Sequence, residues 1–220
     1  MKKITSYLLL AFLLIGCSGE KKGNESRGEG SLVNELQTVG KEADSRRYPI
    51  ERGIIHATNE AMGVEMTMVT YFDKWGEWEA IETTVPMEIW GTDYTARTLE
   101  IIKGDDHWKI DLEEKTGEHF KQSRVINQLG VDMDKLSEEV LGKFDMEDLG
   151  EVDFLGYKCR RMRMKSDMST AMDYVMWGNV MMQMEGEAMG IPTSMRVTSV
   201  EETTPPREVF DVPEGIDFIE

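Results

Sequence analysis

Apolar and polar residues alternate along most of the chain after residue 48, and Gly, Asn and Asp interrupt the alternation at short intervals. Between positions 64 and 72, for instance, alternate positions are occupied by Val64, Met66, Met68, Thr70 and Phe72. A side-chain period of two is typical of a β-strand with one buried face and one exposed face. The pattern therefore predicts a mainly β fold built from antiparallel hairpins.

The same alternation sets the bounds of the predicted strands. They cover residues 50–58, 64–72, 75–85, 94–103, 108–112, 151–154, 157–165, 171–177, 180–187 and 191–202. Turn residues such as Gly104 and Gly156 separate neighbouring strands. We expect the tail that begins at Pro205 to be extended and to seal one edge of the sheet.

Two segments show helical spacing of their apolar residues instead. They are residues 31–41, which follow Ser31 as a capping residue, and residues 132–144, which follow an aspartate cap. In the second segment the apolar residues lie on one side of the helix and charged residues lie on the other. We therefore expect one or two amphipathic helices to pack on the sheet, which makes the fold mainly β with an α+β character.

The N-terminal residues have the features of a bacterial lipoprotein export signal. Lys2 and Lys3 precede an apolar run over residues 7–15, and Leu-Ile-Gly-Cys ending at Cys17 follows directly. A bilayer core requires about 20 helical residues, so this run is too short for a permanent span. The four residues resemble a lipobox, in which the cysteine is acylated and becomes the first mature residue. We predict a signal peptide over residues 1–16 and lipidation of Cys17.

The rest of the chain divides into a tether and one domain. Residues 18–30 contain four glycines and no strongly apolar residue, so residues 17–30 are predicted to be the lipidated cysteine and a flexible tether. Residues 31–220 are predicted to form a single domain. Ser18 after Cys17 favours the outer membrane over the inner membrane, by analogy with lipoprotein sorting in enteric bacteria. We expect an exported protein that is lipid-anchored in the cell envelope.

The strong negative charge excludes one class of partner. The formal net charge is −17, and it becomes −19 when Lys2 and Lys3 leave with the signal peptide. Affinity for nucleic acid comes mainly from Lys and Arg side chains that neutralise phosphates. We therefore expect no nucleic-acid partner, and we expect membrane attachment through the lipid of Cys17 rather than through a basic patch.

Candidate catalytic residues are scarce. Cys159 is the only cysteine besides Cys17, and its setting in a predicted strand indicates a buried structural residue. The three histidines, His56, His107 and His119, lie on separate elements and match no metal-binding or catalytic motif. The sequence therefore predicts a non-catalytic protein without a cofactor or a metal site.

Several segments resemble a known family. They are Gly-Tyr-Lys-Cys at 156–159, Trp-Gly-Asn at 177–179, Phe-Asp-Val-Pro-Glu-Gly-Ile at 210–216, and the strand-turn-strand arrangement over 98–120. Over residues 48–219 the chain is similar to the lipoprotein-carrier superfamily (LolA/LolB-like), and most of all to its uncharacterised lipid-anchored bacterial members. The resemblance implies a curved antiparallel half-barrel sheet, covered by helices, with an apolar cavity for acyl chains. No position matches the carriers' key Arg, so no working residue is transferred.

Methionine is the residue type that is used in excess. The chain has 17, and ten of them lie between Met162 and Met195. Unbranched thioethers adapt to irregular apolar partners, so they suit a cavity that accepts hydrocarbon chains. We expect the lining of this cavity to include Met66, Met68, Met162, Met164, Met172, Met176, Met182, Met184 and Trp177.

Thioether sulfur also favours Cu(I), which gives an alternative use for these residues. Met172 and Met176 would stand about 13 Å apart along one strand, too far for one ion. Met164 could meet Met182 or Met184 only across strands, which the sequence does not reveal. The hypothesis is therefore a membrane-anchored lipoprotein that binds lipid or acyl chains in a half-barrel cavity. The alternatives are a Met-rich periplasmic Cu(I)-binding protein and a structural or interaction module of the cell envelope.

Overall fold

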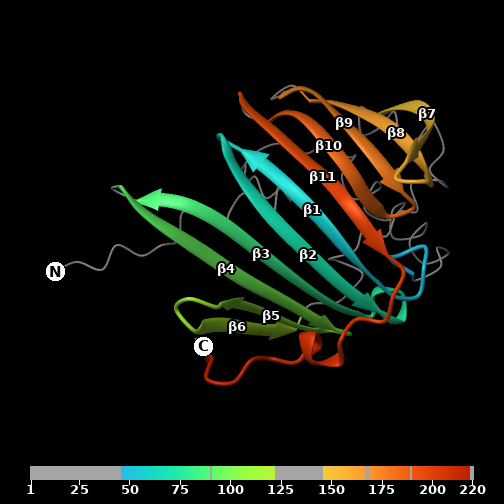
Figure 1. Cartoon of the computed structure of the whole chain (residues 1–220). Helices are drawn as coiled ribbons and strands as arrows, with labels where there is room; N and C mark the ends of the chain where they lie inside the picture. The colour runs from blue at the N-terminus through green and yellow to red at the C-terminus, as the bar shows by residue number, and fades with distance from the viewer. Residues whose placement is uncertain (1–45, 90, 122–145, 167–168, 189, 219–220) are drawn as a thin grey trace, which may run out of the picture.

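The computed structural model describes residues 46–89, 91–121, 146–166, 169–188 and 190–218. Within these ranges the chain forms one curved sheet of twelve strands, antiparallel except at one edge (Figure 1). The mainly β fold class predicted from the sequence is confirmed. The signal peptide, Cys17, the tether and the two predicted helices lie outside the described residues. No helix within the described ranges has the length and apolar character needed to span a membrane.

The sheet consists of two meanders that join in its middle. The first meander contains β1 (Gly53–Ala61), β2 (Val64–Asp73), β3 (Trp78–Ile89), β4 (Thr92–Lys103), β5 (Asp106–Asp111) and β6 (Thr116–Lys121). The second contains β7 (Met146–Phe154), β8 (Tyr157–Ser166), β9 (Ser169–Trp177), β10 (Val180–Ala188) and β11 (Ile191–Glu201). β1 pairs with β11, so the strand order is β12-β6-β5-β4-β3-β2-β1-β11-β10-β9-β8-β7.

Short hairpin turns hold neighbouring strands in register. Between β1 and β2, Met62 and Gly63 both adopt positive φ angles, 57° and 75°. Positive φ at both central residues defines the type I′ turn, whose twist matches that of the paired strands. Leu155 and Gly156 repeat this geometry between β7 and β8, with φ angles of 52° and 86°. In each pair glycine occupies the second position, where it adopts positive φ without the steric cost of a side chain.

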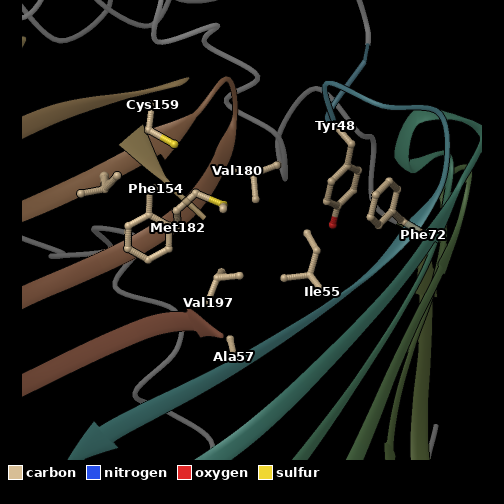
Figure 2. Close-up of a cluster of buried hydrophobic side chains, with 10 residues drawn as sticks. Tyr48, Ile55, Ala57, Phe72, Phe154, Cys159, Val180, Met182 and Val197 are labelled. Atoms are coloured by element: carbon tan, nitrogen blue, oxygen red, sulfur yellow. The ribbon is translucent and has the colours of Figure 1, made fainter. Parts of the chain in front are cut away.

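A first apolar cluster lies where the two meanders meet (Figure 2). It combines Tyr48, which precedes β1, with residues of β1, β2 and the second meander. Its buried members are Tyr48, Ile55, Ala57, Phe72, Phe154, Cys159, Val175, Val180, Met182 and Val197. In Figure 2 the labelled side chains of this cluster lie between the two sides of the curved sheet. Cys159 is thus the buried strand residue that the sequence predicted.

A second apolar cluster lies under the C-terminal tail. After β11 the tail forms η4 (Arg207–Phe210) and then β12 (Asp217–Phe218), which pairs in parallel with β6. Phe210 is 2% exposed and packs with Ala80, Leu99, Ile101 and Ile110 of β3 to β5. The tail seals a sheet edge as predicted, but η4 interrupts its extended course, and Phe210 of η4 buries part of the sheet face.

Several strand bounds differ from the predictions. β1 begins at Gly53, three residues later than predicted, because residues 46–52 form an irregular segment. β3 begins at Trp78 because η2 (Lys74–Gly76) precedes it, and the carboxylate of Asp73 accepts a 2.7 Å hydrogen bond from the backbone N–H of Lys74. β6 was not predicted, since its sequence Thr-Gly-Glu-His-Phe-Lys has little apolar alternation. β7 is longer than predicted and begins at Met146.

Candidate functional site: a methionine-rich sheet face and a buried polar cluster

Six residues form a row across one face of the sheet, from β8 to β2. Each is the direct cross-strand partner of the next. We call them the thioether row: Met162, Tyr174, Met184, Met195, Asn59 and Met66. Direct partners in an antiparallel sheet point to the same face, and Asn59 alternates with Ile55 and Ala57 in β1. The row therefore lies on the face of β1 that also carries part of the first apolar cluster.

A group of four methionines lies at the β7 end of this face. Met164 of β8 pairs directly with Met146 of β7 on one side and with Met172 of β9 on the other. Met162 lies two residues before Met164, so it points to the same face. We call Met146, Met162, Met164 and Met172 the thioether corner. Met162 is completely buried and Met172 is 8% exposed, whereas Met146 and Met164 are half-buried.

Glycine in β10 makes room for the thioether corner. A Cβ on Gly186 would lie 2.8 Å from the carbonyl oxygen of Ala171 and 3.0 Å from Cγ of Met172. The Met172 side chain therefore occupies the space above Gly186, which any larger residue would fill. The Tyr174 hydroxyl also lies 3.7 Å from Sδ of Met172 and donates a hydrogen bond to it.

The structure brings most of the predicted lining residues to this face. Met66, Met162, Met164, Met172 and Met184 belong to the row or the corner. Met68 pairs with Ala57 and so points the same way, while Met182 is buried in the first apolar cluster.

The other two predicted lining residues behave differently. Met176 and Trp177 are consecutive in β9, so their side chains start out toward opposite faces. Trp177 packs on Tyr157 with ring centroids 4.2 Å apart. Sequence reasoning did not single out Met146 and Met195, because their places in the corner and the row depend on strand register.

A buried polar cluster occupies the same face further along the sheet. Glu79 of β3 is completely buried and accepts hydrogen bonds from the Tyr48 hydroxyl and, at 2.5 Å, from Nη1 of Arg47. Burial and the negative charge of Glu79 raise the pKa of Tyr48 well above its ordinary value. Burial opposes the charge of Arg47, but the charges of Glu79, Tyr48 and Glu100 together outweigh it and raise the pKa of Arg47. Glu79 is thus a buried carboxyl group that accepts hydrogen bonds from two donors.

The polar cluster continues into β4 and β5. Nε2 of His107 lies 2.5 Å from Oε1 of Glu100, and Nζ of Lys109 lies 3.8 Å from the same oxygen. Burial pushes the pKa of Glu100 upward, but the hydrogen bond and charge of His107 and the charges of Lys109 and Arg47 hold it below its ordinary value. The buried Nδ1 of His107 has no hydrogen-bond partner within the described part of the chain. Each carboxylate of this cluster is therefore neutralised by cations of the same chain.

Residues 46–50 bridge the two meanders. At one end, Nδ2 of Asn179 donates a 3.4 Å hydrogen bond to the carbonyl oxygen of Arg46, at the turn between β9 and β10. At the other end, Arg47 and Tyr48 reach Glu79, and the Tyr48 ring stacks on Phe72 at 3.8 Å. Sequence reasoning missed this bridge. Glu79 could have indicated it, because Glu79 is a single charged residue on the face of β3 that also carries Ile81.

The arginines of β8 form ion pairs with acidic residues of the neighbouring strands. Arg161 and Arg163 both donate to Asp173 of β9 at 2.7 Å, and Arg160 donates to Asp148 of β7 at 2.6 Å. The hydrogen bond from Arg163 leads the interactions that lower the pKa of Asp173 to about 2. These arginines therefore do not form a free anion-binding patch. Across the residues that the structure describes, no three His, Cys, Asp or Glu side chains gather as a metal site.

Comparison with known proteins supports the fold and leaves the function open to proposal. The sequence matches no family model and no curated protein. Among solved structures, the fold is similar to an uncharacterized conserved protein from Thermus thermophilus, with a TM-score of 0.50 and 8% identity. That alignment covers 86% of this chain and 97% of the other. At this identity the likeness is one of fold alone.

More distant solved structures carry functional names. A putative outer membrane lipoprotein-sorting protein domain from Vibrio parahaemolyticus aligns at a TM-score of 0.35 and 10% identity, over 81% of this chain and 97% of the other. The MucA/MucB complex of Pseudomonas aeruginosa aligns at 0.44 and 8% identity, over 83% of this chain and 60% of the matched chain. Likenesses this weak carry no argument about function.

Proposed function

We propose that this protein is an exported, membrane-anchored lipoprotein that binds lipid or acyl chains on the face of the thioether row. The observation that carries the proposal is the row itself, which extends over six neighbouring strands. Unbranched thioethers suit hydrocarbon chains of variable shape, because they change conformation at little cost. The proposed role is binding rather than catalysis, and the carboxylates of the polar cluster over β3 to β5 are paired with neighbouring donors.

The proposed anchor comes from the sequence. The lipobox that ends at Cys17 lies outside the described residues. On the basis of this motif, the proposal takes Cys17 as the acylation site. Two or more acyl chains hold a protein to a bilayer stably, since each buried methylene contributes about 0.8 kcal/mol. An anchored domain stands within tether reach of membrane lipids, which is where an acyl-binding face is useful. Substitution Cys17→Ser should abolish acylation and release the protein from the membrane fraction.

A pair of matched variants tests ligand binding. The chain from Ser18 onward would be titrated with a fluorescent fatty acid, and bound lipid would be identified by mass spectrometry of the gently purified protein. Met184→Glu places a charge in the row and should weaken binding at least about tenfold, because an ionised carboxylate is costly to desolvate. The control is Gln183→Glu, at the neighbouring position of β10. This variant should bind the fatty acid as the parent protein does.

Met184→Leu separates apolar character from sulfur chemistry. This change keeps side-chain volume and apolarity, so fatty-acid binding should persist. Circular dichroism and thermal unfolding would show that each variant is folded. Absence of both co-purified lipid and saturable fatty-acid binding in the parent protein would contradict the proposal, as would equal weakening by Gln183→Glu and Met184→Glu.

A further inference from the structure

The thioether corner contains more sulfur than packing requires. Methionine has no β-branch, so it is less favoured in strands than valine or isoleucine. Its burial also costs up to about 2 kcal/mol of rotamer entropy, against roughly 0.5–1 for isoleucine or leucine. On the same face of β3, the apolar positions are occupied by Ile81 and Val85 instead. We therefore infer that methionine is used in the thioether corner for a property of its sulfur atom and not only to fill apolar volume.

The strand register brings these sulfurs together. Met164 is central, because it pairs directly with both Met146 and Met172. Directly opposite residues have Cβ atoms about 4.5–5.5 Å apart, and diagonal neighbours such as Met162 and Met172 about 7–8 Å apart. Each sulfur lies two bonds beyond Cβ on a chain with three rotatable bonds. Three or four sulfurs can therefore converge on one point above β8.

We propose that the thioether corner is a binding site for a soft monovalent cation, Cu(I) or its analogue Ag(I). Uncharged thioethers select Cu(I) among the biological metals, whereas Mg²⁺ and Ca²⁺ require oxygen ligands. Met164 and Met172 are the central ligands, with Met162 and Met146 completing the set. The ion keeps its oxidation state on binding, and no proton is released, because a thioether has none to lose. The site shares Met162 with the thioether row, but the proposal does not rest on the proposed acyl binding.

The surroundings of the corner suit a weakly hydrated cation. Met146 and Met164 are half-buried, so an ion reaches them from solvent, while the buried Met162 and Met172 form the floor. Asp148 is the direct strand partner of Met162, and its carboxylate accepts a 2.6 Å hydrogen bond from Nη2 of Arg160, which balances its charge. Sδ of Met172 accepts a hydrogen bond from the Tyr174 hydroxyl with one lone pair, so its second lone pair would bind the ion.

The test is anaerobic titration of the mature full-length protein in detergent with Cu(I), in competition with a chromophoric chelator. Removal of a group that only orients a metal ligand costs about 10–100-fold in affinity, so loss of a ligand should cost at least tenfold. Met164→Leu should therefore weaken Cu(I) binding by at least about that factor. The control Met66→Leu, five strands away in the sheet order, should leave it unchanged. Fatty-acid binding should survive Met164→Leu, because Met164 lies outside the thioether row and leucine preserves apolarity.

Two further measurements separate thioethers from other ligands. Cys159→Ala should retain Cu(I) binding, because Cys159 is buried in the first apolar cluster. Affinity should also be the same at pH 5 and pH 7, whereas sites built from cysteine or histidine lose affinity as their ligands are protonated. X-ray absorption of the Cu(I) or Ag(I) complex should show sulfur-only coordination.

Several results would overturn the proposal. They are equal Cu(I) affinities of the parent and Met164→Leu, loss of binding in Cys159→Ala, and nitrogen in the first coordination shell. If Met162→Leu and Met172→Leu also bind as the parent does, the corner is core packing only. Each of these results concerns Cu(I) alone, whereas loss of fatty-acid binding with intact Cu(I) binding would contradict only the proposed function.

Discussion

Strands β8 to β2 and strands β3 to β5 contribute to one continuous sheet face, yet the two regions differ in chemistry. Across β8 to β2 the cross-strand partners are mostly methionines, with Tyr174 and Asn59 as the polar members. Across β3 to β5 the same face carries Glu79, Glu100 and Lys109, with His107. The six residues of the thioether row carry no charge, whereas the charged groups of the polar region pair with one another.

This difference separates two tasks within one architecture. The polar region fixes residues 46–50 to β3, because a buried carboxylate demands specific donors. The methionine region has no such directional demand, so its side chains are able to adapt to another apolar group. Stability and binding should therefore respond to different substitutions, and the following predictions test that separation.

The largest expected effect is in the polar region. Glu79→Ala leaves the Tyr48 hydroxyl and the Arg47 guanidinium without their acceptor, and breaking such a buried pair costs roughly 3–5 kcal/mol. Glu82→Ala is the control, since Glu82 is exposed on the same strand, and it should change stability by less than about 0.5 kcal/mol. Urea denaturation measures the free energy of unfolding of both variants. Similar losses for the two variants would mean that Glu79 does not hold the bridge.

A smaller effect is expected at the methionine floor. Met162 is completely buried, so Met162→Ala removes packed atoms and should cost about 2–4 kcal/mol. Met162→Leu conserves volume and should cost less than about 1.5 kcal/mol. Thermal unfolding of both variants gives the comparison. If leucine destabilised the protein as much as alanine does, the side-chain shape at this position would be fixed rather than adaptable.

The smallest effect concerns the ion pairs of β8 and β9. The pKa of Asp173 is lowered to about 2, so its contribution is present above the ordinary aspartate pKa of about 3.9 and is lost as the pH falls through 2. Because Asp173 is close to solvent, the contribution should be at most about 1 kcal/mol. Asp173→Asn should therefore destabilise the protein at pH 7 but not at pH 2. Equal effects at both values would refute the pairing.

The sequence predicts the positions of the strands better than it predicts which residues of different strands pair with each other. Alternation located β2 and β8 to β11 closely, because each has one face that is largely apolar. It missed β6, where Phe120 is the only strongly apolar residue. The pairing of Met164 with Met172 was not predictable, since register arises from the long-range joining of the strands. The partners of Glu79 were missed for a similar reason, because Arg47 and Tyr48 lie 32 and 31 residues away along the chain.

Photo-crosslinking tests the central claim most directly, because it maps a bound acyl chain onto the sheet. The chain from Ser18 onward would be irradiated with a fatty acid that carries a diazirine along its hydrocarbon chain, and the adducts would be located by peptide mass spectrometry. We predict saturable adducts at the thioether row, chiefly in β8, β10 and β11, which excess unlabelled fatty acid suppresses. Adducts confined to β3 to β5, or labelling that excess fatty acid does not suppress, would contradict the account.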